Sequence, residues 1–151
     1  MKIKVVCAPL DQIKCDLLVV NEFEGVKQPG GATGAADKAL HGLISRLTKE
    51  GEIDGKLGKV SLLHCSGDLK AGKVAVVGLG KREKFDLEAV RTASAAAVRK
   101  GKEIKAKTVA TIVHGAGIGG LDPAAAAQAL AEGSILGAYN FAGYAKEKEE
   151  P

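Results

Sequence analysis

Short, nearly continuous apolar runs rich in Val alternate along the chain with stripes of apolar residues spaced three to four apart. The runs LLVVN, VAVVG and VATIVH have the length and composition of strands that are buried on both faces, as in a sheet covered by helices. The pattern predicts five strands: Ile3 to Cys7, Leu17 to Asn21, Lys59 to Cys65, Lys73 to Val77 and Thr108 to His114.

Three segments between and after these runs carry helical patterns. The first has one apolar stripe of 3.6-residue period from Ala36 to Leu47. The second follows Asp86, which suits an N-cap, and continues to Val98. The third opens with the pair Asp122-Pro123, an N-cap followed by proline at the first helical position, and runs towards Tyr144.

The third predicted helix contains Gly133 and Gly137, which are four residues apart and therefore share a face. Glycine lowers helix stability by up to about 1 kcal/mol relative to Ala, so its presence here needs a reason. We expect another element to approach the helix closely at these positions.

The order of the predicted elements is β, β, α, β, β, α, β, α. This order predicts an α/β fold with three layers, α/β/α, around a mixed sheet of about five or six strands. A length of 151 residues suits one domain with its own core. Because aromatic residues make up only 3% of the chain, we expect that core to consist mainly of Val, Leu, Ile and Ala.

Charge and cysteine content limit the partners and the cellular compartment that we expect for the protein. The net charge of +4 gives no strong attraction to nucleic acid or to a membrane surface. The three cysteines, Cys7, Cys15 and Cys65, form no C-x-x-C pair, which argues against a disulfide framework or a structural zinc site. The N-terminus has no secretory signal pattern, and no apolar stretch approaches the roughly 20 residues of a membrane span. A cytoplasmic protein is expected.

The segment HGAGIGG is the first candidate for a ligand site. Gly115, Gly117 and Gly120 satisfy G-x-G-x-x-G after a strand and before a helix, the context of a loop that binds a dinucleotide pyrophosphate. That motif also needs a following strand that ends in an acidic residue about 20 positions on, and an Ala-rich helix stands there instead. A Gly-rich turn is the simpler interpretation.

Two further turns are candidates for anion binding. Gly78 to Lys81 follows a strand, and Lys81, Arg82 and Lys84 precede the helix at Asp86, but the Walker A pattern is absent. Pro29 to Gly34 is a glycine-rich loop between the strand DLLVVN and the first helix. This second loop is similar to the ligand loop of ADP-ribose-binding macrodomains, although its glycines equally suit a simple entry into the helix.

Nucleophilic, metal and nucleic-acid sites find little support. The three histidines, His41, His64 and His114, show no metal-ligand spacing, and no H-E-x-x-H or G-x-S-x-G occurs. A Cys65–His114 pair across neighbouring strands stays open geometrically. The basic run is interpreted as a solvated helix end rather than a phosphate-binding surface. It comprises Arg99, Lys100, Lys102, Lys105 and Lys107. From the residues alone we assign no catalytic, cofactor-binding or metal-binding residue.

Several segments, read in order, resemble the N-terminal domain of the leucyl aminopeptidase (cytosol aminopeptidase) family. They are DLLVVNEFEG, AADKALHGLISRLTKEGEIDGKLGKV, KVAVVGLGKREKFDLEAVRTASAAAVRK and ALAEGSILGAYNFAGYAKEKE. Together they span nearly the whole chain. No single segment is a decisive motif, but their order and spacing are those of the family.

The resemblance implies a macrodomain-like domain over residues 1–145 and a charged linker to a catalytic domain over residues 146–151. Members of the family are hexameric exopeptidases that use two divalent metal ions, zinc or manganese, and their metal ligands and catalytic residues lie in the C-terminal domain. The expected role is therefore a non-catalytic one, in subunit contacts and in shaping access to the catalytic domain. The alternative is a stand-alone macrodomain-like module that binds a nucleotide or ADP-ribose.

Overall fold

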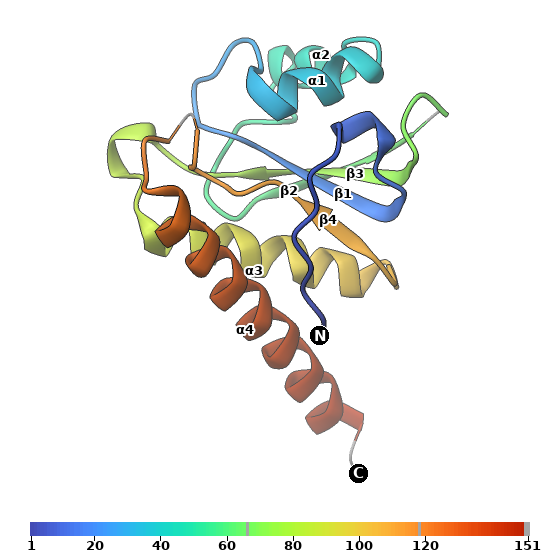
Figure 1. Ribbon diagram of the computed structural model, residues 1–151, viewed down its shortest axis with the longest axis vertical. Coiled ribbons are helices and arrows are strands. Elements are labelled where there is room, and N and C mark those ends of the chain that lie inside the picture. Colours follow the sequence, from blue (N-terminus) through green and yellow to red (C-terminus); the bar gives the residue numbers. More distant parts are fainter. Residues whose placement is uncertain (66, 118, 150–151) are drawn as a thin grey trace.

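The computed structural model describes residues 1–65, 67–117 and 119–149, and it has three layers with a sheet between two pairs of helices (Figure 1). The four strands of the described sheet lie in the order β2-β3-β1-β4. Their bounds are β1 Cys15–Glu22, β2 Val60–His64, β3 Ala71–Gly78 and β4 Val109–Thr111. β1 runs parallel to both β3 and β4, whereas β2 is antiparallel to β3. The predicted α/β/α architecture with a mixed sheet is confirmed.

The two helical layers cover opposite faces of the sheet. Figure 1 shows α1 (Gly31–Ala39) and α2 (Leu43–Lys49) on one side, and α3 (Leu87–Glu103) and α4 (Pro123–Glu149) on the other. Alternate residues of β1 serve the two cores, since side chains alternate across a strand. Leu18 and Val20 pack with α1 and α2, while Leu17 and Val19 pack with α3. The short 3-10 turns are η1 (Leu10–Gln12) and η2 (Arg82–Lys84).

The strand predicted over residues 3–7 does not form, and that prediction is wrong. Residues 1–9 have no regular secondary structure, and the Val5 side chain is 96% exposed. A strand needs a neighbour to supply backbone hydrogen bonds, and this segment pairs with no strand of the sheet. The described sheet therefore has four strands rather than five or six.

The first predicted helix is divided in two. A break falls at His41 and Gly42, both of which have left-handed φ values of 57° and 80°. The apolar stripe continues across the break, because Leu40 and Ile44 both enter the core beneath it. Periodicity therefore identified the buried face but not the turn.

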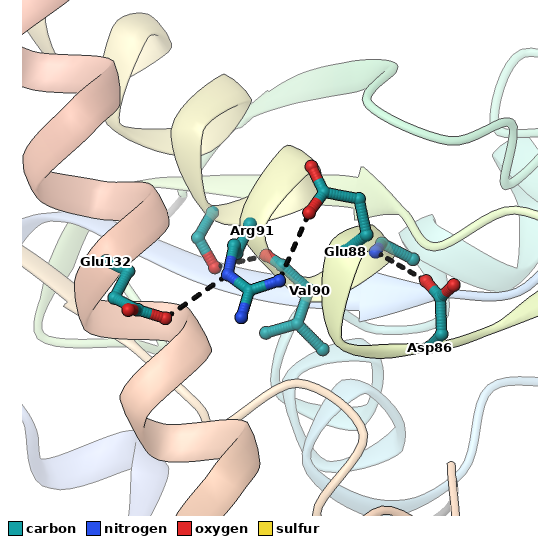
Figure 2. A network of polar contacts seen from close by, with 7 residues as sticks. Asp86, Glu88, Val90, Arg91 and Glu132 are labelled. Atoms are coloured by element: carbon teal, nitrogen blue, oxygen red, sulfur yellow. Dashed lines mark hydrogen bonds and ion pairs between the residues drawn. The ribbon is translucent and has the colours of Figure 1, made fainter.

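The helices α3 and α4 lie in close contact through the two glycines of α4. A Cβ atom on Gly133 would lie 2.4 Å from the Arg91 carbonyl oxygen, and one on Gly137 would lie 2.7 Å from the Ala95 Cα. The expected close approach is confirmed. Figure 2 shows Arg91 of α3 between two carboxylates, with Nε donating to Glu132 of α4 at 3.2 Å.

The helix starts follow the capping residues predicted from the sequence. The Asp86 carboxylate accepts from the Ala89 N–H at 2.9 Å at the start of α3 (Figure 2). The Asp122 carboxylate accepts from the Ala125 N–H at 3.0 Å at the start of α4. Each bond satisfies one of the backbone donors that a helix leaves free at its N-terminus.

Candidate functional site

The carboxyl ends of the parallel strands β1, β3 and β4 carry most of the candidate residues. Ligands of open α/β sheets bind outside this edge, because the loops that leave the strands converge there. Asn21 and Glu22 end β1, the turn from Gly78 follows β3, and His114 follows β4. Pro29 and Gly30 lead into α1 at the same edge, and Gly31 to Gly34, predicted as part of a loop, form the first turn of that helix; the segment from Pro29 to Gly34 is called the Pro29–Gly34 loop below.

His114 is fully buried at this edge and is held by two side chains. The Asn21 amide donates to His114 Nδ1 at 2.9 Å, which leaves the proton of the neutral ring on Nε2. Nε2 lies 3.4 Å from the Thr111 hydroxyl. Burial lowers the pKa of His114 to about 4, so the ring is neutral at physiological pH. His114 therefore fixes the end of β4 against β1.

The Pro29–Gly34 loop is pinned to the end of β1 by Thr33. Its hydroxyl donates to the Asn21 carbonyl at 2.6 Å and accepts from the Asn21 N–H at 3.2 Å. The loop lines a cavity of about 210 Å³ together with Phe23 and Arg82. No side chain caps the first N–H groups of α1, which begins after Gly30. This glycine-rich candidate therefore borders a cavity through Pro29, Gly30 and Thr33.

Two glycines of HGAGIGG pack against Phe85, whereas a Cβ on Gly117 or Gly120 would meet no described atom within 4 Å. A Cβ on Gly115 would lie 2.4 Å from the Phe85 ring, and one on Gly119 would lie 2.6 Å from it. Phe85 in turn packs edge-on against Phe23, with ring centroids 5.0 Å apart. Gly115 and Gly119 thus make room for an aromatic ring, which agrees with the interpretation as a Gly-rich turn.

The turn from Gly78 to Lys81 has its backbone donors occupied. The N–H groups of Gly78, Leu79 and Gly80 donate to the carbonyls of Lys59, Glu22 and Gly55 at 2.9 Å each. These bonds join β3, β1 and the loop before β2. Arg82 lies over the Phe23 ring at 4.4 Å, a cation–π contact. The turn is a structural junction and presents no row of free N–H groups to an anion.

The histidine and cysteine candidates do not come together. β2 is antiparallel to β3, with His64 opposite Lys73 near the start of β3. Cys65 therefore lies at the opposite end of the sheet from His114, and a Cys65–His114 pair is excluded. His41 is exposed and pairs with Asp68 at 2.6 Å.

The basic run falls at the end of α3. Lys100 and Lys102 occupy its last turn, and Lys100 pairs with Glu103 at 3.1 Å. Cations in this position are stabilised by the carbonyl end of the helix. The solvated helix end predicted for this run fits the structure.

Glu22 is a buried carboxyl that the sequence reading did not single out. Its side chain lies next to Thr48 of α2, whose hydroxyl is 3.1 and 3.2 Å from the two carboxylate oxygens. Burial raises the pKa of Glu22 to about 7, and the nearby Asp37 charge adds to the rise. The sequence feature that could have identified Glu22 is its position as a charged residue directly after the apolar run LLVV and Asn21.

Glu22 also lines the larger cavity of this edge, about 680 Å³ in volume. The cavity lies between the end of β1, the loop that follows it, α2 and the loop after α2. Its wall is lined in part by Val26, Lys27, Lys49 and Ile53.

Two further kinds of functional feature are absent from the described part of the chain. In the described part of the chain, no three His, Cys, Asp or Glu side chains gather as they would around a metal ion. Among the same residues, no helix combines the length and the hydropathy of a membrane-spanning segment.

Known proteins resemble this chain in sequence and in fold. A sequence model of the cytosol aminopeptidase family, N-terminal domain, matches residues 19–148. A probable cytosol aminopeptidase of Alkaliphilus metalliredigens is 33% identical over 153 residues, covering 99% of this chain and 30% of that protein. The chain thus spans less than a third of the length of this relative.

Two solved structures show the same architecture. The macrodomain of Mycobacterium tuberculosis DarG has a TM-score of 0.70 at 19% identity, covering 87% of this chain and 88% of that one. A mutant tomato leucine aminopeptidase has a TM-score of 0.63 at 23% identity, covering 84% of this chain and 26% of that one. The macrodomain-like fold is confirmed.

Proposed function

The chain belongs to the cytosol aminopeptidase family, in which it matches the N-terminal domain, and we propose that it is the non-catalytic N-terminal domain of a metal-dependent leucyl aminopeptidase. The observation that carries the proposal is the family match over residues 19–148, in a chain that corresponds to 30% of a full-length relative. The site geometry is compatible with it, because the glycine-rich turns and His114 serve packing and hydrogen bonding.

The proposed role is to support and border a catalytic domain that holds two divalent metal ions, zinc or manganese. In this proposal the protein is cytoplasmic, and its partners are its own catalytic domain and the neighbouring subunits of a homo-hexamer. Nucleic acid is not among them. The boundary between a domain at residues 1–145 and a linker at residues 146–151 is part of the same proposal; α4 continues to Glu149.

The outer face of α4 is the surface that we assign to the catalytic domain. Ile135, Leu136 and Tyr139 are 51%, 55% and 73% exposed, although α4 packs along α3. Large apolar side chains that gather on one exposed surface mark interaction sites. The catalytic domain is the favoured occupant because the relatives carry more than two thirds of their length outside the matched region.

We expect the double substitution Ile135→Ser and Tyr139→Ser to change the free energy of unfolding of the isolated chain by less than about 0.5 kcal/mol, because both side chains are exposed. In the full-length protein the same substitutions should increase amide hydrogen exchange along α4 and lower leucine amide hydrolysis, since the domains lose a contact. Lys38→Ser with Arg46→Ser, on the opposite layer, is the matched control. Unchanged exchange and activity in the full-length variant would contradict the assigned surface.

Nucleotide or ADP-ribose binding through Gly30 to Gly34 is the second candidate function. It is favoured by the cavity of about 210 Å³ beside this loop and by the uncapped start of α1. Helix N-termini bind phosphates through free N–H groups and the helix dipole. Under this alternative, calorimetry detects ADP-ribose binding tighter than about 100 µM. The leading proposal expects no heat of binding at that concentration.

A further inference from the structure

The cavity of about 680 Å³ at the end of β1 has an uneven distribution of charge. Its buried part is formed by Glu22 and Ile53, which are 4% and 3% exposed, and its rim carries the exposed Lys27 and Lys49. The volume lies within the range of about 300–1,000 Å³ that is usual for small-molecule sites. A carboxyl thus lies at the bottom of the cavity and two ammonium groups lie at its mouth.

Two other polar groups of the cavity wall are already paired. Asp54 binds Lys59 at 3.0 Å, and the Ser45 hydroxyl donates to Asp37. Among the described residues, the Glu22 carboxylate accepts a hydrogen bond from the Thr48 hydroxyl alone, although a carboxylate can accept about four. In the described part of the chain, Lys27 and Lys49 form no ion pair. Glu22, Lys27 and Lys49 therefore remain for a ligand, together with the exposed amide of Gln28.

We propose that this cavity binds a free α-amino acid with an apolar side chain. The ammonium group of the ligand pairs with Glu22, its carboxylate faces Lys27 and Lys49, and its side chain packs against Val26 and Ile53. Binding at this cavity requires no contact between the chain and a catalytic domain.

Other ligand classes fit these groups less well. A metal ion would meet the carboxylates of Glu22 and Asp54, of which Asp54 is paired with Lys59, and in the described residues no set of three ligating side chains gathers there. A phosphate would meet the buried carboxyl of Glu22, which repels anions once it is ionised. A simple alkylammonium ion would leave both lysines unpaired and would have to pass between them. An amino acid zwitterion satisfies both ends of the cavity.

Binding of the ligand's ammonium group would also offset the unfavourable free energy of burying the Glu22 carboxylate. Desolvation holds its pKa at about 7, so the carboxyl is partly protonated at neutral pH. A cation in contact favours the ionised form, so binding releases a proton. The charged groups around Glu22 are Asp37 on α1, Lys49 on α2, Lys27 and Asp54 on the flanking loops, and Arg82, which lines the smaller cavity together with Glu22.

Calorimetry of the purified chain with L-leucine tests the proposal. We expect binding with a Kd on the order of 0.1–1 mM. Affinity should weaken as the pH falls from 8 to 6, because Glu22 takes up a proton. At pH 7 the apparent enthalpy should change with the ionisation enthalpy of the buffer, which reports the released proton. Affinity that does not change with pH would contradict the pairing with Glu22.

Two analogues of leucine separate the two ends of the ligand. 4-Methylpentanoate lacks the ammonium group and 3-methylbutylamine lacks the carboxylate. Each should bind at least roughly tenfold more weakly than leucine, since each loses a charge-assisted contact. Equal binding of the amine would overturn the role of the lysines, and equal binding of the acid would overturn that of Glu22.

Substitutions in the chain provide the matched test. Glu22→Gln keeps the shape of the side chain and should weaken leucine binding by roughly tenfold or more, and Lys27→Ala with Lys49→Ala should do the same. Glu103→Gln and Lys102→Ala, at the end of α3, should leave the affinity unchanged. Absence of heat with the unmodified chain at about 10 mM leucine, or retained binding in Glu22→Gln, would overturn the proposal.

Discussion

Replacement of Gly133 by Ala is expected to destabilise the chain by about 2 kcal/mol, although alanine is the better helix former. The added methyl carbon would lie 2.4 Å from the Arg91 carbonyl oxygen, 2.7 Å from its Cα and 2.9 Å from its carbonyl carbon. All three atoms belong to the backbone of α3, so no side chain can rotate away. The two helices must separate or slide, which also strains the Arg91–Glu132 ion pair.

Urea unfolding of the Gly133→Ala variant measures this cost through the midpoint at an unchanged slope. The matched control is Ala127→Gly at an exposed position of α4, which changes helix propensity alone and should cost less than about 1 kcal/mol. A stability gain in Gly133→Ala would show that α4 does not pack against α3 as described. A displaced α4 would also move the exposed side chains of Ile135 and Tyr139, so the same variant should weaken the proposed contact with a catalytic domain.

The central strands were predictable because their sequences leave few alternatives. LLVVN and VAVVG are continuous apolar runs, and only a strand flanked on both edges and covered on both faces buries every residue of such a run. Both occupy the middle of the sheet, and Val19 and Val77 have no exposed surface. The N-caps Asp86 and Asp122 were predictable as well, because an N-cap depends on local contacts within one turn.

The N-terminal segment could not be predicted in this way. Ile3 and Val5 are residues that favour an extended backbone. Their presence does not show whether a partner strand is available to pair with the segment. Because no strand pairs with this segment, the side chains of Val5 and Val6 remain exposed to solvent. The interruption at His41 and Gly42 was hidden for a related reason, because the apolar stripe needs only the correct face and tolerates a turn.

The candidate site shows the same division between local and non-local information. The spacing of Gly115, Gly117 and Gly120 satisfies a phosphate-binding fingerprint. The structure shows instead that Gly115 and its neighbour Gly119 make room for Phe85, which stands 30 residues or more earlier in the chain. Glu22 was missed because its burial depends on α2 covering the end of β1. In both cases the role of the residue depends on contacts between segments that are far apart in the chain. Such contacts cannot be inferred from a single sequence.

Glu22→Gln is expected to stabilise the chain at pH 8 by about 2–3 kcal/mol and to leave its stability at pH 4 nearly unchanged. The pKa of Glu22 is about 7 in the folded chain against an ordinary value of 4.5. Below pH 4.5 the carboxyl is protonated in both states and costs nothing. Between pH 4.5 and 7 the unfolded chain releases the proton while the folded chain retains it, so stability falls as the pH rises.

Above pH 7 the folded chain carries an ionised carboxylate in a site that is 4% exposed, and the full loss persists. Glutamine carries no titratable proton, and its amide oxygen can accept from the Thr48 hydroxyl as the carboxyl does. Thermal and urea unfolding between pH 4 and pH 8 should therefore show that Glu22→Gln gains stability relative to the unmodified chain as the pH rises, whereas the exposed control Glu103→Gln does not. The buried His114, whose pKa is about 4, adds a contribution that rises with pH and is common to all three chains. Parallel pH profiles for all three would mean that Glu22 is solvated and that the cavity does not hold a buried charge. A relative gain with pH that is confined to Glu22→Gln would show that Glu22 lowers stability at neutral pH, as expected where a buried group is retained for binding rather than for folding.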